Sequence, residues 1–318
     1  MIQWIRSFKW SVQCYNFFRK DALSHNIPLY KKYGIPKQYY SSVSSEDFKH
    51  LDNPKLKYDT LDSAQELPKE DGFSQLDTAT QDALLPWSKN GYAVLEGFFS
   101  HDEVDTYNQE IQNLLARKQV QWGYGQKIMF AFRKSKPLYQ AATHPKLMSI
   151  LSLLMGKEMQ LFQSINFLKG SQQRAHSDFI HMTTFPKNNL IAAWGALEDI
   201  TEDSGPLHYY PGSHTLPYVL NPHFDNVGTF FRNGKGTYSD YEDRVQETID
   251  EHALVKNVFL AKKGDVFIWH ANLLHGGEPM INPQASRKSM VFHYFSKDAI
   301  CYHEISQRPA LMPRFSFD

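Results

Sequence analysis

Cysteine is scarce in this chain of 318 residues, since only Cys14 and Cys301 are present and neither lies in a paired motif. A disulfide framework is therefore not expected, and a reducing cytoplasm is the predicted environment. Long apolar runs are missing too. No stretch approaches the roughly 18 residues of a transmembrane helix, and the N-terminus lacks the uninterrupted apolar core and the cleavage site of a signal peptide.

An excess of either charge sign is also absent, because Lys plus Arg and Asp plus Glu each number 34. This balance gives no reason to expect nucleic acid or an acidic partner. What the chain does contain is 42% hydrophobic and 14% aromatic residues, which predicts a packed globular protein. Its length suits one large domain or two small ones.

The first 40 residues carry seven Lys or Arg against Asp21 alone, and Ile5, Phe8, Val12 and Tyr15 recur at helical spacing. Such a helix could lie on a membrane surface or face a lipid. The favoured interpretation is a helix docked on the main domain, because amphipathic helices mostly face protein cores. We expect residues 1–75 to be a basic, aromatic extension with an irregular connector, and residues 76–318 to be the main domain.

Helical patterns precede strand patterns in the main domain. Helices are predicted at 76–89, after the capping box of Ser100 and Glu103, and after Thr143, with Gly156 ending the last one. Residues 221–254 are polar and long, and are interpreted as a lid. Short alternating strands, separated by turn signals, suggest a sandwich or barrel with helices outside. The predicted strands are 92–99, 159–168, 179–184, 190–197, 207–210, 255–261, 266–270 and 289–296.

The triplet His176-Ser177-Asp178 is the first candidate for chemistry. In extended backbone, residues two apart point to the same side, so the imidazole and the carboxylate would lie together. With one more histidine they make the set that holds non-haem Fe(II) and leaves positions open. Alone the triplet is weak, since chance gives about one such motif in this chain, and a buried His–carboxylate pair without metal is the alternative. Another His-x-acid, at His101 and Glu103, looks like a helix start.

Further motifs follow the triplet in a fixed order. They are 194–197, Asp-Ser-Gly-Pro-Leu at 203–207, Tyr-Pro-Gly-Ser-His at 210–214, Gly-Asp at 264–265, His-Gly at 275–276 and Arg-Lys-Ser at 287–289. A strand and helix at 91–115 come before it. In this order, over about residues 84–297, the chain resembles the phytanoyl-CoA dioxygenase family of Fe(II)/2-oxoglutarate oxygenases. The resemblance implies a mainly β fold with flanking helices (α+β) around a double-stranded β-helix, or jelly-roll, and the use of Fe(II), 2-oxoglutarate and O2.

The same resemblance implies roles for residues near the end of the chain. His275 would be the third iron ligand, with His270 as the alternative. Arg287 would hold the distal carboxylate of 2-oxoglutarate, because a planar guanidinium forks onto a carboxylate in two bonds. Ser289, on the same strand face, could donate to that carboxylate. The alternative interpretation of Arg287 is an exposed arginine on the surface with no role in binding.

Other polar residues have two interpretations each. One group could hydrogen-bond the cosubstrate or satisfy the core, namely Gln163, Asn166 and Thr183. Another group could face the substrate, although aromatic strand residues usually pack, namely His181, Trp194, Arg133 and Tyr209. His214 is expected to support the structure or the site without being a ligand.

The predicted activity is hydroxylation of a C–H bond in a small-molecule or lipid-linked substrate. The resemblance favours it because related halogenases have Gly or Ala where this chain has Asp178. The alternative is a non-enzymatic jelly-roll that binds a small ligand or zinc, since two histidines and one carboxylate also suit zinc. Substrate identity and oligomeric state are not readable from the sequence.

Overall fold

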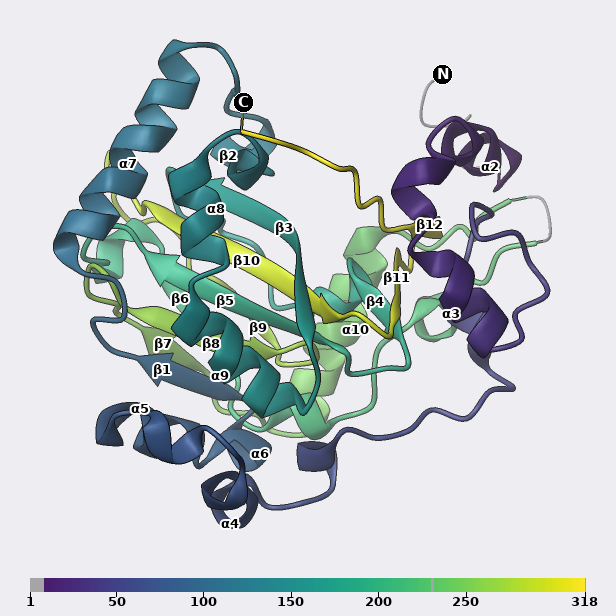
Figure 1. Ribbon diagram of the computed structural model, residues 1–318, viewed down its shortest axis with the longest axis horizontal. Helices are drawn as coiled ribbons and strands as arrows, with labels where there is room; N and C mark the ends of the chain where they lie inside the picture. Colours follow the sequence, from purple (N-terminus) through teal and green to yellow (C-terminus); the bar gives the residue numbers. More distant parts are fainter. Residues whose placement is uncertain (1–8, 230–231, 318) are drawn as a thin grey trace.

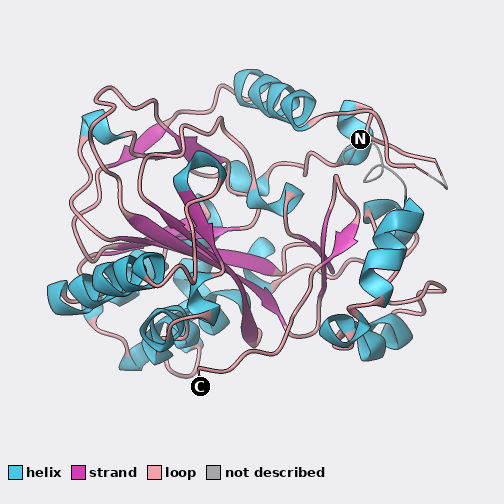
Figure 2. Ribbon diagram, turned by 90° about the horizontal axis from the view of Figure 1, so that it is seen from above, coloured by secondary structure: helices cyan, strands magenta, loops and turns pink. Residues whose placement is uncertain are grey.

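A computed structural model describes residues 9–229 and 232–317. Antiparallel strands lie in the middle of the molecule and helices surround them (Figures 1 and 2). The largest sheet has the strand order β1-β8-β5-β10-β3-β2. Its strands are β1 (Tyr92–Leu95), β2 (Lys127–Met129), β3 (Met159–Phe167), β5 (Leu190–Ala196), β8 (Val266–His270) and β10 (Ser289–Ser296).

Two smaller antiparallel sheets complete the β structure of the described residues. One has the order β7-β6-β9, and the other has the order β12-β11-β4. Their strands are β4 (Thr183–Phe185), β6 (Leu207–Tyr209), β7 (Asn257–Phe259), β9 (His275–Gly277), β11 (Ile300–His303) and β12 (Arg308–Pro309).

The two faces of the large sheet pack against different layers. Because side chains alternate along a strand, Met290, Phe292 and Tyr294 of β10 join one core with α7, α8 and α9. Val291, on the other face, packs toward Leu207 and the β7-β6-β9 sheet. The helices are α2 (Lys9–Phe17), α3 (Asn26–Lys32), α4 (Ser63–Glu66), α5 (Thr78–Leu84), α6 (Trp87–Asn90), α7 (His101–Ala116), α8 (Lys136–Ala142), α9 (Pro145–Met155) and α10 (Tyr238–Glu251).

Mixed helix and antiparallel sheet is the predicted fold class, and β8 and β10 have the predicted bounds. The strand predicted at 179–184 is wrong at its start, because Asp178–Ile180 forms a 3-10 turn and β4 begins only at Thr183. The strands β2, β9, β11 and β12 were not predicted. Each has two to four residues, which is too short for alternation to stand out.

The helix predictions need two corrections. The helix predicted at 76–89 is divided into α5 and α6 around Pro86, since proline lacks the amide that a continuous helix needs. Thr143 is not an N-cap: it ends α8 and its hydroxyl donates to the carbonyl of Tyr139, while His144 precedes α9. The capping box of Ser100 and Glu103 is confirmed.

Of the 34 residues interpreted as a lid, 14 form the helix α10, which packs on the segment that contains the His-x-Asp triplet. Tyr241 and Val245 of α10 are buried with Ile180 and Leu274. The hydroxyl of Tyr241 accepts the amide of Ser177 at 2.9 Å, between the two residues of the His-x-Asp triplet. The helix α10 therefore fixes the backbone that carries them; the lid role of 221–254 stays a prediction.

Tyr241→Phe should lower the free energy of unfolding by about 1–3 kcal/mol, because a buried amide is left without its acceptor. Chemical denaturation measures the loss, and Tyr15→Phe, at a tyrosine that is 45% exposed, is the matched control. Equal stability of Tyr241→Phe and wild type would contradict the packing described for α10.

The N-terminal part packs on the β12-β11-β4 sheet. Leu29 and Tyr30 of α3, with Phe48, are buried against Phe185 and Tyr302. In α2, Val12 is buried as the docked interpretation expects, but Tyr15 is 45% exposed. Ile5 and Phe8 lie outside the described residues, and the domain boundary at 75 stays a prediction. None of the described helices has the length and apolarity needed to cross a bilayer.

Candidate metal centre

Three buried side chains meet where two distant segments pair. The backbones of His176 and His275 exchange two hydrogen bonds of 2.9 Å, N–H to carbonyl in each direction. This antiparallel bridge brings the two imidazole centroids to 4.5 Å from each other. Asp178 lies beside them, and one ligand atom from each of the three lies within 4.8 Å of the others. The two segments are 99 positions apart in the sequence, so only closure of the sheets joins them.

The hydrogen bonds of the rings leave the same nitrogen free on both histidines. The Nδ1 of His176 lies 2.9 Å from the carbonyl of Arg174, and the Nδ1 of His275 lies 3.0 Å from the carbonyl of Leu273. A carbonyl only accepts, so each Nδ1 donates a hydrogen bond to it, and Nε2 is the nitrogen of each ring that is left to bind a metal. Both Nε2 atoms face Oδ1 of Asp178, at 3.9 and 3.7 Å. Three lone pairs thus converge, which is the donor set a divalent cation needs.

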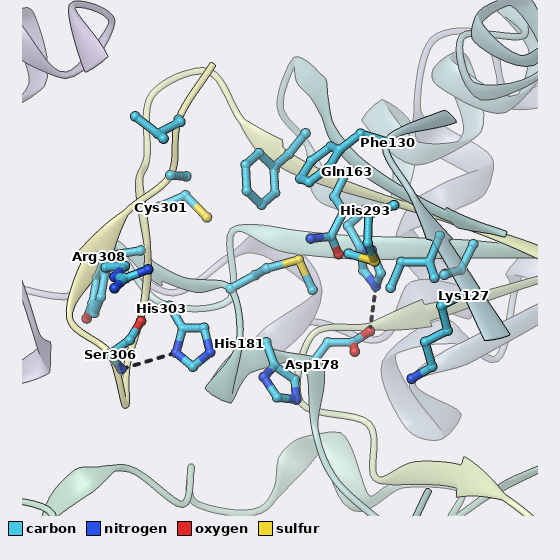
Figure 3. A pocket seen from close by; sticks show the side chains of 18 of the residues that line it. Lys127, Phe130, Gln163, Asp178, His181, His293, Cys301, His303, Ser306 and Arg308 are labelled. Atoms are coloured by element: carbon cyan, nitrogen blue, oxygen red, sulfur yellow. Dashed lines mark hydrogen bonds and ion pairs between the residues drawn. The ribbon is translucent and has the colours of Figure 1, made fainter. Parts of the chain in front are cut away.

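The other oxygen of Asp178 is held away from this point. The indole Nε1 of Trp269 donates to Oδ2 at 2.7 Å, and Nε2 of His293 lies 3.2 Å from the same oxygen. Figure 3 shows Asp178 turned toward His293 within the pocket. The two partners fix the carboxylate so that Oδ1 is the oxygen that faces His176 and His275.

Burial and neighbouring charges set the protonation of the centre. Burial lowers the pKa of His176 well below its usual value, and the adjacent His275 lowers it further. Burial acts to raise the pKa of Asp178, but the imidazoles of His275 and His293 outweigh it and hold that pKa below the usual range. The centre therefore has neutral His176 and an ionised carboxylate at neutral pH, which is the form that binds metal.

Arg287 is buried in the same cavity, and no carboxylate of the described residues pairs with it. Its side chain is 2% exposed, and its Nε and Nη1 have no hydrogen-bond partner among the described residues. The guanidinium lies over the rings of Phe167 and Trp194, at 5.4 and 5.7 Å. Burial lowers its pKa to about 10, so it stays charged at neutral pH. A buried guanidinium without an opposite charge destabilises the folded protein, and a bound anionic ligand would offset this loss.

One cavity of about 1200 Å³ contains both features. His176, Asp178, His275 and Arg287 line it, as does Gln163. Ligand sites for small molecules are typically about 300–1,000 Å³. The cavity therefore has room for a small cosubstrate beside the metal centre and for a larger molecule beyond it.

The remaining candidate residues divide between the cavity and the packed interior. His181, Trp194 and Arg133 line the cavity. The hydroxyl of Thr183 donates to the carbonyl of Phe179 at 2.6 Å, and that of Ser289 lies 3.5 Å from the carbonyl of Arg287. Four others do not line the cavity. Asn166 is buried, and its Nδ2 has no partner among the described residues, while His214 lies beside Gly91. The ring of Tyr209 packs on Tyr92 and Phe267, although its backbone pairs with that of His275. The Nδ1 of His270 accepts a hydrogen bond from the amide of Asn272. Cosubstrate roles for Ser289, Gln163 and Thr183 stay predictions.

Sequence reasoning missed Trp269 and His293. His293 follows Arg287 by six residues, and even spacing on a strand puts both on one face, so the alternation could have indicated it. Trp269 had no such signal, because its link to Asp178 depends on how the sheets close. Lys127, on a strand too short to predict, also lines the cavity.

The chain is similar in sequence and in fold to known oxygenases. The family model for phytanoyl-CoA dioxygenase (PhyH) matches residues 87–289. Bovine peroxisomal phytanoyl-CoA dioxygenase is 22% identical over 243 residues, which are 68% of this chain and 68% of that protein. The crystal structure of SnoK, a non-haem α-ketoglutarate-dependent carbocyclase from nogalamycin biosynthesis, superposes with a TM-score of 0.60 at 18% identity, covering 77% of this chain and 96% of SnoK. EctD from Sphingopyxis alaskensis, crystallised with 2-oxoglutarate and 5-hydroxyectoine, gives a TM-score of 0.51 at 24% identity, over 70% and 76% of the two chains.

The match to the dioxygenase family model, together with a shared fold and a buried His–Asp–His centre, defines a non-haem iron, 2-oxoglutarate-dependent oxygenase. Within that class the chain belongs to the phytanoyl-CoA dioxygenase family, since the family model spans well over half of its length. The predicted family and enzyme class are confirmed.

Proposed function

We propose that His176, Asp178 and His275 hold Fe(II), that Arg287 anchors 2-oxoglutarate, and that the protein hydroxylates a C–H bond of a small molecule. The observation that carries this proposal is that one cavity contains three converging metal donors and a buried guanidinium that no carboxylate of the described residues neutralises. Both halves of the site are incomplete without ligands of opposite charge. A double-stranded β-helix core is part of the same proposal.

The residues of the chain have separate tasks in this scheme. Bound iron, with 2-oxoglutarate and O2, supplies the oxidising chemistry. Asp178 offers one oxygen because Trp269 and His293 occupy the other. The carbonyls of Arg174 and Leu273 fix the tautomers of the two histidines. Arg287 orients the keto acid by its far carboxylate, and the surrounding Phe167 and Trp194 rings keep water from that contact.

The test is formation of succinate from 2-oxoglutarate by anaerobically purified protein after addition of Fe(II) and air. Iron-dependent turnover is expected, with zinc inactive. Tight zinc binding without any 2-oxoglutarate binding would favour the alternative, a non-enzymatic metal-binding protein.

Trp269→Phe should weaken iron binding by about 10–100-fold, which is the usual effect of removing a group that orients a metal ligand. The substitution keeps the packed ring and removes only the donor to Asp178. Trp194→Phe is the matched control, because its indole Nε1 has no partner among the described residues. Competition with a chelator measures the affinity; equal affinities in the two variants would contradict the role given to Trp269.

Contact of the N-terminal segment with membranes is a further part of the proposal. Trp10, Phe17 and Phe18 are 57%, 48% and 83% exposed, and Lys20 and Arg19 lie beside them. Exposed aromatics among basic residues suit a lipid-water interface. Sedimentation with anionic liposomes should be stronger for the full chain than for one that lacks residues 1–20, and equal sedimentation would remove membrane contact. From the scarcity of cysteine we propose a cytoplasmic location.

A further inference from the structure

Positive charge gathers in the cavity although the chain as a whole is neutral. Six cationic side chains line it, against the carboxylates of Asp21 and Asp178 only. The cationic residues are Arg19, Lys127, Arg133, Arg287, Arg308 and Arg314. In the proposed function a divalent cation and a dianionic cosubstrate offset each other at Asp178 and Arg287. The positive charge that remains is carried by side chains in the rest of the cavity.

Outside the proposed cosubstrate site, Arg133 is a cation of the cavity that lies against aromatic rings. Its guanidinium lies 4.1 Å from the ring centre of Phe130 and 5.4 Å from that of Phe132. Its Nε is buried without a partner among the described residues, and its one hydrogen bond there is a long contact of 3.4 Å to the carbonyl of Phe162. Burial lowers its pKa. A flat, stacked guanidinium with free N–H groups suits a carboxylate or a phosphate.

Apolar side chains also line the cavity, among them Phe130, Phe162, Ile165, Met182 and Val291. Figure 3 shows Phe130 and Gln163 on one side of the pocket and Cys301 and Arg308 across from them. The molecule that fits has an apolar body and an anionic end.

The two ends of the chain form the outer wall of the cavity. Tyr15, Phe18 and Arg19 line it from one end, and Arg308, Leu311 and Arg314 line it from the other. The amide of Met312 donates to the carbonyl of Ala22 at 2.8 Å, which ties the ends together. Phe315 then packs on Phe132 at 5.4 Å, next to Arg133. The yellow C-terminal tail runs from β12, beside the N-terminal helices, to α8 (Figure 1).

We propose that the outer part of the cavity binds the anionic end of an amphiphilic substrate, with Arg133 as the residue that contacts the anion. Part of the wall comes from segments outside residues 87–289, including Tyr15, Phe18, Leu311 and Arg314, and we expect these segments to contribute to the specificity. The proposal rests on the proposed function for its claim that the bound molecule is the substrate.

Calorimetric titration with decyl phosphate, below its micelle concentration, tests the site. Iron-loaded protein with 2-oxoglutarate is used under anaerobic conditions, and metal-free protein is titrated in parallel. Binding in the metal-free form supports the anionic site even if the oxygenase scheme fails. Decyltrimethylammonium and inorganic phosphate should bind at least about 10-fold more weakly, because one has the wrong charge and the other has no apolar body. Comparing the affinities for decanoate and decyl phosphate shows whether the site prefers a carboxylate or a phosphate.

Arg133→Gln should weaken decyl phosphate about 10–100-fold, with 2-oxoglutarate affinity unchanged as the check on folding. Arg314→Gln, on the exposed tail, should weaken decyl phosphate binding a few-fold. This variant replaces Arg133→Gln in the test if Arg133→Gln does not fold. Arg117→Gln, at an exposed arginine outside the cavity, is the matched control. The proposal is overturned if the ammonium compound or inorganic phosphate binds as tightly as decyl phosphate, or if the cavity variants keep wild-type affinity.

Discussion

His176→Ala should reduce succinate release by more than about 100-fold, since removing even a group that only supports a metal ligand typically costs 10–100-fold. The imidazole is buried, and its Nε2 faces Oδ1 of Asp178 with no other polar partner in the described structure. Alanine removes one of three donors and leaves the antiparallel backbone bridge to His275 able to form. The assay is succinate formation at saturating Fe(II) and 2-oxoglutarate.

The sequence contains its own control for this experiment. His101 also begins a His-x-acid triplet, but it is the exposed first residue of α7. His101→Ala should retain wild-type turnover. Comparable activity of His176→Ala and His101→Ala would mean that the buried triplet does not take part in catalysis.

Arg287→Gln should raise the KM for 2-oxoglutarate by about 10–100-fold, with a smaller change in kcat. Hydrogen bonds to a charged partner contribute about 1.5–3 kcal/mol each, and a bidentate pair loses its geometry when glutamine replaces the guanidinium. Steady-state kinetics over a wide range of 2-oxoglutarate measures the shift, with Arg117→Gln as the surface control. An unchanged KM would exclude Arg287 as the anchor.

The same residue gives a second readout that needs no turnover. In the absence of 2-oxoglutarate, Arg287 is a buried charge that no carboxylate of the described residues offsets, which destabilises the fold. Arg287→Met should therefore leave the metal-free protein at least as stable as wild type. It should also abolish the rise in stability that 2-oxoglutarate gives the iron-loaded wild type. A large loss of stability in the metal-free variant would instead indicate a structural arginine.

The sequence was most informative where a motif or a long alternation carried the signal. The strands β8 and β10 and the helix α9 follow directly from their apolar periodicity. The choice of His275 over His270 rested on the order of family motifs, and the structure brings His275 to the triplet. His270 is the last residue of β8 and is not part of the triad. Its Nδ1 accepts a hydrogen bond from the amide of Asn272.

What the sequence could not predict depends on contacts between distant segments. The strand β9 has three residues and is defined by its pairing with β6. The helix α10 was hidden in a polar segment because only one narrow stripe of it, with Tyr241 and Val245, is buried. The cavity wall formed by the chain ends depends on a hydrogen bond from Met312 to Ala22, which no local pattern encodes.

Equilibrium dialysis of Fe(II) under anaerobic conditions tests the central claim most directly. Wild-type protein should bind one iron per chain, and alanine at His176, Asp178 or His275 should abolish tight binding. His270→Gln should keep it, because His270 is not among the converging donors. Retention of iron by His275→Ala together with its loss from His270→Gln would contradict the site as described.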